Sequence, residues 1–355
     1  MDKKTRIVIS GYYGFDNMGD EAILFAMINM LRANIKNIEI IVLSNNPQAT
    51  KTAYNVKAVN RFSPICIISA IKKCDLLISG GGSLLQDVTS LKTIPYYLSI
   101  VQIAIFFGKK IVFYSQGIGP VNKYANRYLI KKIANKVNYI FVRDNKSKQL
   151  LKKIGVKTEI EVSPDPVFAL KLDNNLNQKI KKEFQYKKNI GIYIRPWKNQ
   201  NQIVNTISEA AQYLINQNYQ IYLVCMQPSQ DIQIARQVIK KVNNSSIKII
   251  EKSLTINETL SYTANFDFII GMRLHSLIMA IITKTPMIAL SYDPKVENIM
   301  NEMHIEHQIR IEEISFELLK PQIDYIIQNL SLEKKKFIDI ENIQKPIHYI
   351  KKLLL

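Results

Sequence analysis

The sequence predicts an α/β protein made of two Rossmann-like domains, each built on a doubly wound parallel sheet. Strand-like apolar segments alternate with helix-like segments over residues 6–142, and a second alternation runs over residues 189–290. Strands that are separated by helices pair in parallel through right-handed crossovers. The length of 355 residues also exceeds that of a typical single domain, so two domains are expected.

The first domain is predicted to span residues 1–172. Its strands are expected at residues 6–10, 39–43, 75–79, 110–114 and 139–142. Its helices are expected at residues 21–32, 63–73, 95–107 and 123–136. The polar and glycine-rich loops that follow these strands should therefore meet at the carboxyl edge of one sheet.

The alternation stops between residues 163 and 185, where the Asn- and Lys-rich stretch 173–182 is interpreted as a linker or a poorly packed helix. The second domain is predicted to span residues 186–355 and to end in helices. Its strands are expected at residues 189–194, 220–225, 247–250, 268–270 and 287–290. Its other helices are expected at residues 202–216, 232–241, 256–263 and 274–282. Two doubly wound halves predict a ligand cleft between them, and the arrangement resembles the one called GT-B.

The chain is strongly basic, with 48 Lys and Arg against 29 Asp and Glu, a net charge of +19 and a pI of about 9.6. This excess favours an anionic partner such as a phosphorylated substrate, an acidic lipid or nucleic acid. The lysines are dispersed along helix-like segments, so solvated helix faces explain the larger share. A nucleic-acid site is not expected, because the aromatic residues mostly lie in apolar segments.

Three features favour a cytoplasmic protein. The cysteines Cys66, Cys74 and Cys225 are too few and too scattered for a disulfide framework or a zinc ribbon, which predicts a reducing compartment. The apolar run at residues 7–9 is too short for a signal peptide. The longer run at residues 94–107 falls short of the ~20 residues that span a bilayer, so a buried helix is expected there.

The loop after the first strand, residues 11–21, is the first candidate binding site. Glycines permit close backbone approach there, and the following helix offers free N–H groups to an anion or a sugar oxygen. Asp20 could instead be the N-cap of that helix, but this explains only one residue of a turn rich in aromatic, amide and carboxylate side chains. A binding loop is therefore favoured. Its candidate residues are Tyr12, Tyr13, Asp16, Asn17 and Asp20.

Three more loops follow predicted strands of the first domain. Their candidate residues are Gly81, Gly82, Gln86 and Asp87 in the loop 79–87, Gln116 in the loop 116–120, and Arg143 after the strand 139–142. A tight strand-to-helix turn is the alternative for both glycine-rich loops. Arg143 can bind a carboxylate or a phosphate through its forked guanidinium. The alternative for Arg143 is an ion pair with Asp144 or another neighbour.

In the second domain the candidates are Arg273, His275 and Lys295, which also follow predicted strands. A lone histidine is more often structural than catalytic, but His275 lies beside an arginine at a strand end, which favours a functional role. His304 and His307 have a spacing of three that a metal site could use. No third ligand is evident, so no metal is expected.

Taken together, these loops resemble the polysaccharide pyruvyl transferase family, and most closely its CsaB-type bacterial cell-wall branch. The motifs are GYYGFDNMGDEA at residues 11–22, SGGGSLLQD at 79–87, QGIGP at 116–120, VRD at 142–144, SPDPVF at 163–168, GMRLHS at 271–276 and YDPKV at 292–296. They occur in order over most of the chain. The tail after residue 300 matches nothing in the family pattern.

The resemblance implies a GT-B-like fold and the transfer of enolpyruvate from phosphoenolpyruvate (PEP) to a sugar, which forms a cyclic ketal and releases phosphate. No cofactor besides this co-substrate is implied. In the cell-wall branch the acceptor is a lipid-linked disaccharide or oligosaccharide with N-acetylmannosamine, and the 4,6-ketal holds surface-layer proteins. A basic surface beside the loops of the first domain would then attract the inner face of the cell membrane.

The resemblance also implies roles for single residues. Arg143, His275 and Lys295 would contact PEP, and Arg273 adds a further cation near its two anionic groups. His275 would help the phosphate to leave, and Asp16, Asp20 or Asp87 would orient or deprotonate the acceptor hydroxyl. The residues expected to bind the acceptor are Tyr12, Tyr13, Asn17, Gly81, Gly82, Gln86 and Gln116.

Two other functions fit the same pattern. A nucleotide-sugar glycosyltransferase would use the same two-domain cleft, with an acidic residue of the second half binding a ribose. A basic glycan- or nucleic-acid-binding protein without turnover would need clustered basic residues with interleaved aromatics.

Overall fold

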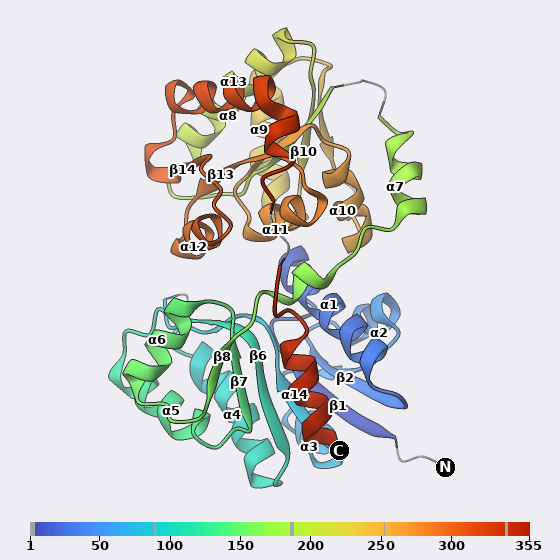
Figure 1. Cartoon of the computed structure of the whole chain (residues 1–355), viewed down its shortest axis with the longest axis vertical. Helices are drawn as coiled ribbons and strands as arrows, with labels where there is room; N and C mark the ends of the chain where they lie inside the picture. Colours follow the sequence, from blue (N-terminus) through green and yellow to red (C-terminus); the bar gives the residue numbers. More distant parts are fainter. Residues whose placement is uncertain (1–3, 89, 185–187, 252, 338–339) are drawn as a thin grey trace. The chain divides into compact units, whose positions relative to one another are not determined.

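The computed structural model describes residues 4–88, 90–184, 188–251, 253–337 and 340–355. They form two compact units (Figure 1). Unit 1 comprises Met1–Ala169 and Ile340–Leu355, and unit 2 comprises Leu170–Asp339. Each unit is a parallel β-sheet covered by helices, so the predicted class of two doubly wound α/β domains is confirmed.

The sheet of unit 1 has the strand order β3-β2-β1-β4-β6-β7-β8, with β5 paired to β6. Its strands are β1 (Thr5–Ser10), β2 (Ile38–Ser44), β3 (Lys57–Asn60), β4 (Leu76–Ser79), β5 (Gly82–Leu85), β6 (Lys110–Ile118), β7 (Tyr139–Val142) and β8 (Ile160–Val162). Its helices are α1 (Met18–Asn34), α2 (Pro47–Tyr54), α3 (Pro64–Lys73), α4 (Thr93–Phe106), α5 (Tyr124–Ala134), α6 (Asn145–Ile154), the 3-10 helix η1 (Pro166–Ala169) and α14 (Lys345–Leu354). The strand order reverses between β1 and β4, and such switch points open a crevice at the carboxyl edge of the sheet.

The sheet of unit 2 has the strand order β11-β10-β9-β12-β13-β14. Its strands are β9 (Asn189–Tyr193), β10 (Gln220–Val224), β11 (Ile247–Ile250), β12 (Phe268–Gly271), β13 (Met287–Ser291) and β14 (Gln308–Arg310). Its helices are α7 (Asn174–Lys181), α8 (Gln200–Asn216), α9 (Pro228–Val242), α10 (Ile256–Ala264), α11 (Leu274–Thr283), α12 (Pro294–Glu302), the 3-10 helix η2 (Ile311–Glu313) and α13 (Phe316–Glu333). The switch point of this sheet lies between β9 and β12.

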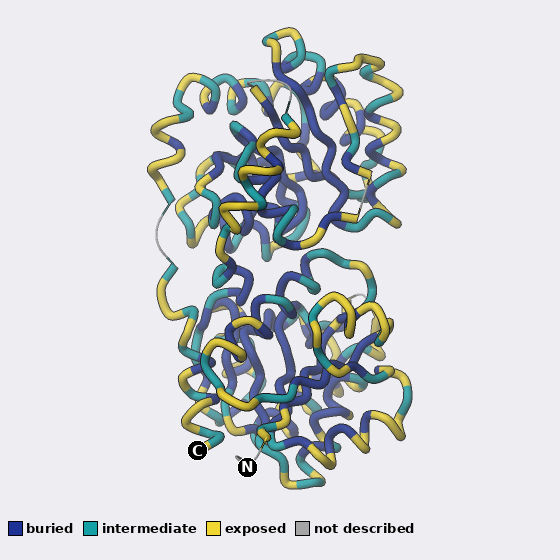
Figure 2. Tube along the Cα trace, turned by 90° about the vertical axis from the view of Figure 1, so that its right-hand side faces the viewer, coloured by how far each residue is buried: buried dark blue, intermediate teal, exposed yellow. Residues whose placement is uncertain are grey.

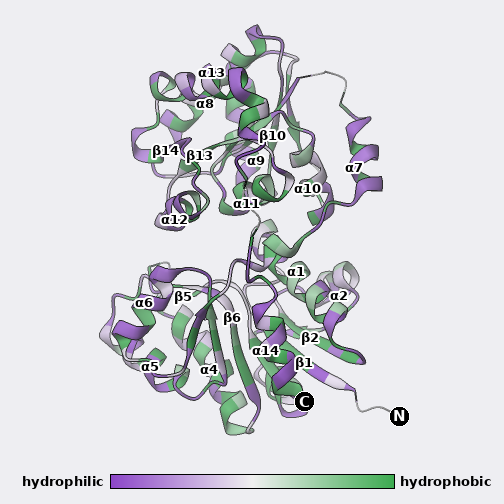
Figure 3. Cartoon of the chain, in the orientation of Figure 1, coloured by the Kyte–Doolittle hydropathy of each residue, from purple (hydrophilic) through white to green (hydrophobic). Residues whose placement is uncertain are grey.

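The central strands are buried on both faces, as Figure 2 shows for each unit. Ile7, Val8 and Ile9 of β1 are fully buried, and so are Phe268, Ile269 and Ile270 of β12. This explains why these strands read as continuous apolar runs in the sequence rather than as alternating ones. The covering helices carry hydrophobic and hydrophilic faces (Figure 3).

The end of the chain departs from the predicted domain boundary, because α14 belongs to unit 1 rather than to the second domain. Its Ile347 and Ile350 are buried. The ring of Tyr349 packs edge-on against Tyr139 and Phe141 of β7, with centroid distances of 4.9 and 5.4 Å. These apolar contacts give the last helix a place in the core of unit 1.

The stretch predicted as a linker or a poorly packed helix is α7 of unit 2. Asp173 caps it by accepting hydrogen bonds from the backbone N–H groups of Asn175 and Leu176. Ile180 is its one buried residue, so the second alternative is correct. The apolar run at residues 94–107 forms α4, a helix of 14 residues with one buried side and one exposed side. Across the described ranges, no helix combines the length and apolar character needed to cross a bilayer.

Candidate active site

The loop between β1 and α1 is fixed by the polar residues at its end. Asn17 is the N-cap of α1: its side-chain oxygen accepts from Gly19 N at 3.2 Å, and its Nδ2 donates to Asp20 Oδ2 at 2.6 Å. The alternative that Asp20 is the cap is therefore wrong. Glu21 also fixes the loop, because its carboxylate accepts hydrogen bonds from Gly14 N at 2.7 Å and from the Tyr54 hydroxyl at 2.6 Å.

The two tyrosines of this loop have different environments. The ring of Tyr12 is 39% exposed and stacks on Phe15 with a centroid distance of 4.1 Å. Tyr13 is fully buried, and a Cβ atom on Gly80 would come within 2.3 Å of its hydroxyl oxygen. Tyr12 therefore offers a face to a ligand, whereas Tyr13 packs between the loops that follow β1 and β4. This packing does not support the predicted contact of Tyr13 with the acceptor.

Arg61, at the end of β3, was not among the predicted residues, yet it holds the β1–α1 loop. It is buried, and its guanidinium donates to the carbonyl oxygen of Gly11 at 2.7 Å and to the hydroxyls of Tyr96 and Tyr97 at 3.2 Å. The five rings within 6 Å of its guanidinium carbon are those of Tyr12, Phe15, Phe62, Tyr96 and Tyr97. No acidic side chain of the described ranges pairs with it. The sequence gives no signal for this contact, because it joins segments far apart in the chain.

The predicted proximity of the first two loops is confirmed at one point. Gly82 has a φ of +86°, and a Cβ atom there would lie 2.9 Å from Asp20 Oδ1. The backbone of Gly82 and the carboxylate of Asp20 are therefore neighbours beside the switch point. Gly81 packs against Ile23 of α1. Asp16 lies in the same loop as Asp20 and is exposed, with a φ of +55°.

Three residues predicted in this region have structural roles. Asp87 accepts hydrogen bonds from the backbone N–H groups of Asn122 and Lys123 at 2.8 and 2.9 Å and from Asn126 Nδ2 at 3.1 Å. Burial raises the pKa of Asp87, but these donors outweigh it and lower the pKa overall. A carboxylate with occupied oxygens and a lowered pKa is a poor base, so Asp87 is a loop clamp rather than the base expected from sequence.

The two glutamine candidates are also held by the protein. Gln116 is fully buried in β6, and its Nε2 donates to the carbonyl and hydroxyl oxygens of Ser79 at 2.8 and 2.7 Å. It therefore ties β6 to β4 through its Nε2. Gln86 accepts a hydrogen bond from Val88 N at 2.8 Å through Oε1.

Arg143 is buried at the carboxyl end of β7. Its guanidinium lies 3.8 Å from Asp144 and 3.5 Å from Asp165, so the ion-pair alternative is correct. A Cβ atom on Gly117 would come within 2.6 Å of Arg143 Nη2, so the glycine leaves room for the guanidinium. Arg143 Nε makes no hydrogen bond in the described part of the chain, but it is buried and is the atom that lies 3.8 Å from Asp144 Oδ2.

In unit 2, Arg273 differs from the prediction that it contacts PEP. Its Nε and Nη2 donate to the two oxygens of Asp231 at 2.9 and 2.5 Å, and both side chains are buried. This bidentate pair neutralises the guanidinium and ties the start of α11 to α9. Arg273 is therefore a structural residue here. His275 lies two residues later in the first turn of α11 and is partly exposed.

Lys295 and the unpredicted Arg195 both lie near the ring of Tyr292. Lys295 Nζ is 5.6 Å from the ring centroid of Tyr292, and the guanidinium carbon of Arg195 is 5.1 Å from it. Arg195 also donates to the Tyr292 hydroxyl at 3.4 Å and lies 5.7 Å from the ring of Trp197. Asp293 is 3.6 Å from Lys295 Nζ, but no acid in the described ranges pairs with Arg195.

The carboxyl edge of this sheet therefore gathers cationic and imidazole groups. Arg195 follows β9, His275 follows β12 and Lys295 follows β13, and these three strands are consecutive in the sheet. The expected edge placement of His275 and Lys295 is correct. Arg195 could have been suggested by its position after a strand at the switch point. Arg143 belongs to unit 1, so its meeting with His275 and Lys295 stays a prediction.

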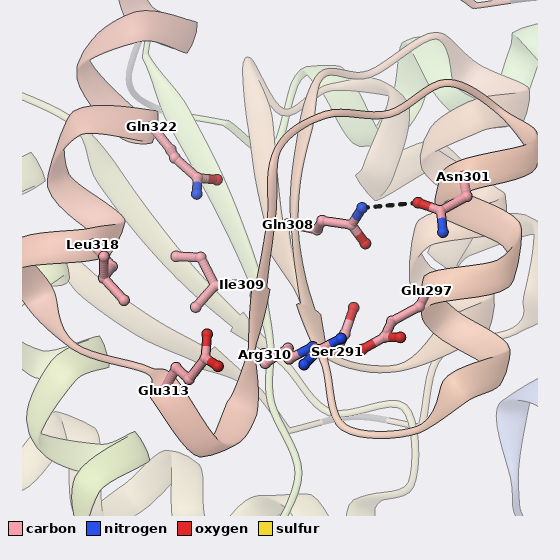
Figure 4. A pocket seen from close by; sticks show the side chains of 9 residues that line it. All are labelled: Ser291, Glu297, Asn301, Gln308, Ile309, Arg310, Glu313, Leu318 and Gln322. Carbon is pink, nitrogen blue, oxygen red and sulfur yellow. Dashed lines mark hydrogen bonds and ion pairs between the residues drawn. The ribbon is translucent and has the colours of Figure 1, made fainter.

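A pocket of about 410 Å³ lies in unit 2 and is lined by residues of α12, β14 and α13 (Figure 4). Its lining residues are Ser291, Glu297, Asn301, Gln308, Ile309, Arg310, Glu313, Leu318 and Gln322. Glu297 pairs with Arg310 at 3.2 Å, and Glu313 adds a second carboxylate. Excess negative charge makes this pocket unsuitable for a dianion, so the candidate site is the edge with Arg195 and Lys295.

The two histidines with metal-like spacing lie apart from this site. His304 follows α12, and His307 lies 3.7 Å from Glu333. Within the ranges that the structure describes, no cluster of three His, Cys, Asp or Glu side chains could hold a metal ion.

Residues 17–294 match the model of a protein family described as polysaccharide pyruvyl transferase. The chain belongs to this family. The match covers the loops with Asn17, Asp20, Arg143 and His275, and it makes the protein a transferase that acts on a polysaccharide or its precursor. Among curated proteins, no sequence match was found.

Solved structures share the fold of this pyruvyl transferase family member at low sequence identity. S. aureus MnaA with UDP has a TM-score of 0.70 at 16% identity over 99% of this chain and 97% of the other. UDP-GlcNAc 2-epimerase from Methanocaldococcus jannaschii has a TM-score of 0.68 at 15% identity, covering 99% and 100%. Anabaena Alr3699/HepE with UDP-glucose has a TM-score of 0.64 at 12% identity, covering 98% and 99%. The fold is therefore GT-B-like, as expected from the sequence.

Proposed function

We propose that the chain transfers enolpyruvate from PEP to a sugar of a cell-wall polysaccharide precursor. Membership of the pyruvyl transferase family supports this class of reaction. The observation that carries the choice of donor is the row formed by Arg195, His275 and Lys295 on consecutive strands. PEP brings a phosphate and a carboxylate, which guanidinium and ammonium groups bind through charge-assisted hydrogen bonds.

The chemistry joins C2 of PEP to two sugar oxygens and breaks its bond to phosphate. A proton is delivered to the methylene carbon C3, so C2 becomes oxocarbenium-like and accepts one sugar hydroxyl, which loses its proton to a base. A second hydroxyl then attacks C2 and loses its proton to a base, while the bond between C2 and the phosphate oxygen breaks and the ketal closes. His275 contacts the phosphate and donates the proton with which it leaves, while Arg195 and Lys295 stabilise its charge.

Unit 1 supplies the acceptor side in this proposal. Tyr12 offers an exposed ring for stacking on a sugar, and Asn17 and the backbone beside Gly82 offer hydrogen-bonding groups. Because the oxygens of Asp87 are occupied, the choice of base narrows to Asp16 and Asp20. Arg143 of unit 1 is also expected to contact PEP, as the family resemblance implies.

The acceptor that we propose is a lipid-linked disaccharide or oligosaccharide with N-acetylmannosamine, pyruvylated as a 4,6-ketal that anchors surface-layer proteins. Support comes from the ordered motifs that resemble the CsaB-type branch. Such an acceptor brings the protein to the inner face of the cell membrane, where a net charge of +19 favours an anionic surface.

Nucleotide-sugar transfer is the main competing function, because proteins of similar fold were solved with UDP and UDP-glucose. A ribose is usually held by a carboxylate near the switch point of the sheet. In unit 2, Asp231 and Asp293 are paired with Arg273 and Lys295. A panel of ligands decides between PEP and a nucleotide as the ligand of unit 2.

A ligand panel tests the proposed function. Thermal unfolding would be followed with PEP, UDP and UDP-N-acetylglucosamine in parallel, and phosphate release would then be measured with PEP and a lipid-linked acceptor. We expect PEP alone of the three to raise Tm, and phosphate release to require the acceptor. A rise with UDP and none with PEP would support glycosyl transfer instead, and the absence of any turnover would support a binding protein.

A further inference from the structure

Helix α3 of unit 1 presents apolar side chains to solvent. It buries Ile67, Ala70 and Ile71, as an amphipathic helix does. Its outward side, however, carries Ile65 and Ile68, which are 81% and 41% exposed, and the preceding Phe62 is 61% exposed. The spacing of three residues places the two isoleucines on the same side of the helix. Exposed apolar side chains grouped on one side of a helix indicate an interaction surface.

The same face is bordered by cations. Helix α3 ends in the exposed Lys72 and Lys73. Beside it lies a groove of about 700 Å³, in which α3 faces the edge strand β3. The apolar lining residues are Ile41, Ala58, Val59, Ile65 and Ala70, and the basic ones are Arg6, Lys51, Lys57 and Lys73.

Glu39 is the one acidic residue that lines this groove, and it is already engaged. It forms ion pairs with Lys57 at 2.7 Å and with Arg6 at 3.2 Å. The hydrogen bond from Lys57 lowers the pKa of this carboxyl, so Glu39 stays charged and offsets only part of the basic rim. The groove therefore combines an apolar floor with surplus positive charge, which suits an amphiphile that carries a phosphate.

We propose that this α3 face, defined by Phe62, Ile65, Ile68, Lys72 and Lys73, docks unit 1 on a bilayer with anionic phospholipids. The apolar side chains enter the boundary between headgroups and acyl chains, and the lysines contact phosphate groups. A second copy of the chain is disfavoured as the occupant, because it would bring two cationic faces together.

Within unit 1, side-chain contacts connect the α3 face to the β1–α1 loop, which is proposed to bind the acceptor. The ring of Phe62 lies 6.1 Å from that of Tyr96 and 5.4 Å from the guanidinium carbon of Arg61. Arg61 in turn holds the carbonyl oxygen of Gly11, where the β1–α1 loop starts. A membrane bound at α3 is therefore close to the residues proposed to bind a lipid-linked sugar. The biological role of this docking rests on the proposed function, but vesicle binding is measured without PEP or acceptor.

Cys66 gives a direct probe of this face. It is exposed on α3, whereas Cys74 and Cys225 are buried, so an environment-sensitive fluorophore attaches at one position. We expect a blue shift with vesicles of phosphatidylcholine and phosphatidylglycerol and none with phosphatidylcholine alone. As a control position, Tyr128→Cys in a Cys66→Ser background places the label on the exposed side of α5, where no shift is expected.

Co-sedimentation of unlabelled variants with the same vesicles measures how much the apolar and the basic side chains of the α3 face contribute to membrane binding. Ile65→Ser with Ile68→Ser, and Lys72→Gln with Lys73→Gln, should each weaken binding, the lysine pair by about fivefold for each charge at low salt. The matched control is Lys131→Gln with Lys132→Gln on α5, which should have little effect. All variants should keep the wild-type Tm and the PEP-induced rise, because the altered side chains are exposed.

Three results would overturn the docking proposal. One is equal loss of binding in the α5 control, which would indicate diffuse attraction to the whole basic surface. Another is sedimentation without any spectral change at Cys66. The third is a wild-type protein that elutes as a dimer while the Ile65 and Ile68 variant elutes as a monomer. Failure of PEP to raise Tm would instead count against the proposed function and leave the vesicle results standing.

Discussion

Unit 2 contains only two glycines, Gly191 and Gly271, whereas the carboxyl edge of unit 1 has glycines in each of the loops after β1 and β4 and within β6. The charged residues differ as well. In unit 1, Arg61 and Arg143 are buried against rings, carbonyls or carboxylates. In unit 2, Arg273 is buried in the same way, but Arg195 and Lys295 are partly exposed beside Tyr292. Close backbone approach suits a neutral polyol that needs hydrogen bonds, and side-chain cations suit a small anion. The comparison supports the acceptor in unit 1 and PEP in unit 2.

The largest effect is expected from replacing His275, the residue of unit 2 that is proposed to donate a proton to the leaving phosphate. His275→Gln should lower kcat for phosphate release by about 10²–10⁴-fold, the usual contribution of a general acid. Acceptor binding, measured by sugar-induced fluorescence change, should stay as in the wild type because unit 1 is intact. His348→Gln, at an exposed position of α14, is the matched control. Near-normal turnover of the His275 variant would refute its role.

Arg273, which is paired with Asp231, is expected to contribute to stability, whereas Arg195 is expected to contribute to PEP binding. Asp231→Asn leaves the buried guanidinium of Arg273 without its counter-charge, and breaking such a pair costs about 3–5 kcal/mol in the free energy of unfolding. Urea unfolding of unit 2 measures this loss. A variant that keeps its stability but fails to bind PEP would show that Arg273 contacts the donor after all.

Arg195→Gln should raise the KM for PEP by about ten- to a hundredfold, because hydrogen bonds to charged groups contribute about 1.5–3 kcal/mol. The KM for the acceptor should not change. Arg195→Lys should recover part of the loss, since charge remains but the fork does not. Arg236→Gln, which removes an exposed arginine of α9 paired with Glu251, controls for loss of one positive charge. Equal changes in both KM values would argue against a donor-specific role for Arg195.

The alternation of strands and helices made both sheets predictable, because central strands are apolar along their whole length. The strands β3, β5, β8 and β14 escaped prediction because they lack the apolar runs that marked the equally short strands β4, β7 and β12. The placement of His275 and Lys295 followed from their positions after strands. Arg61 and Arg273 could not be assigned in the same way, since a guanidinium reads alike whether its partner is a ligand, a ring or an aspartate 42 residues away.

The smallest effect is expected for Asp87, whose substitution tests whether this residue only holds its loop or also acts as the base in unit 1. Its pKa is lowered in the folded protein, so its contribution to stability is complete above the unfolded pKa of about 3.9 and is lost as the pH falls through the lower folded pKa. Asp87→Asn should therefore cost about 1 kcal/mol in the free energy of unfolding at neutral pH and progressively less below pH ~4. If Asp87 is only a clamp, kcat at neutral pH stays within about twofold of wild type at a temperature well below Tm, as urea unfolding and phosphate release measured side by side can decide. A large loss of kcat without a loss of stability would indicate that Asp87 acts on the acceptor hydroxyl. It would also weaken the contrast drawn between the carboxyl edges of units 1 and 2.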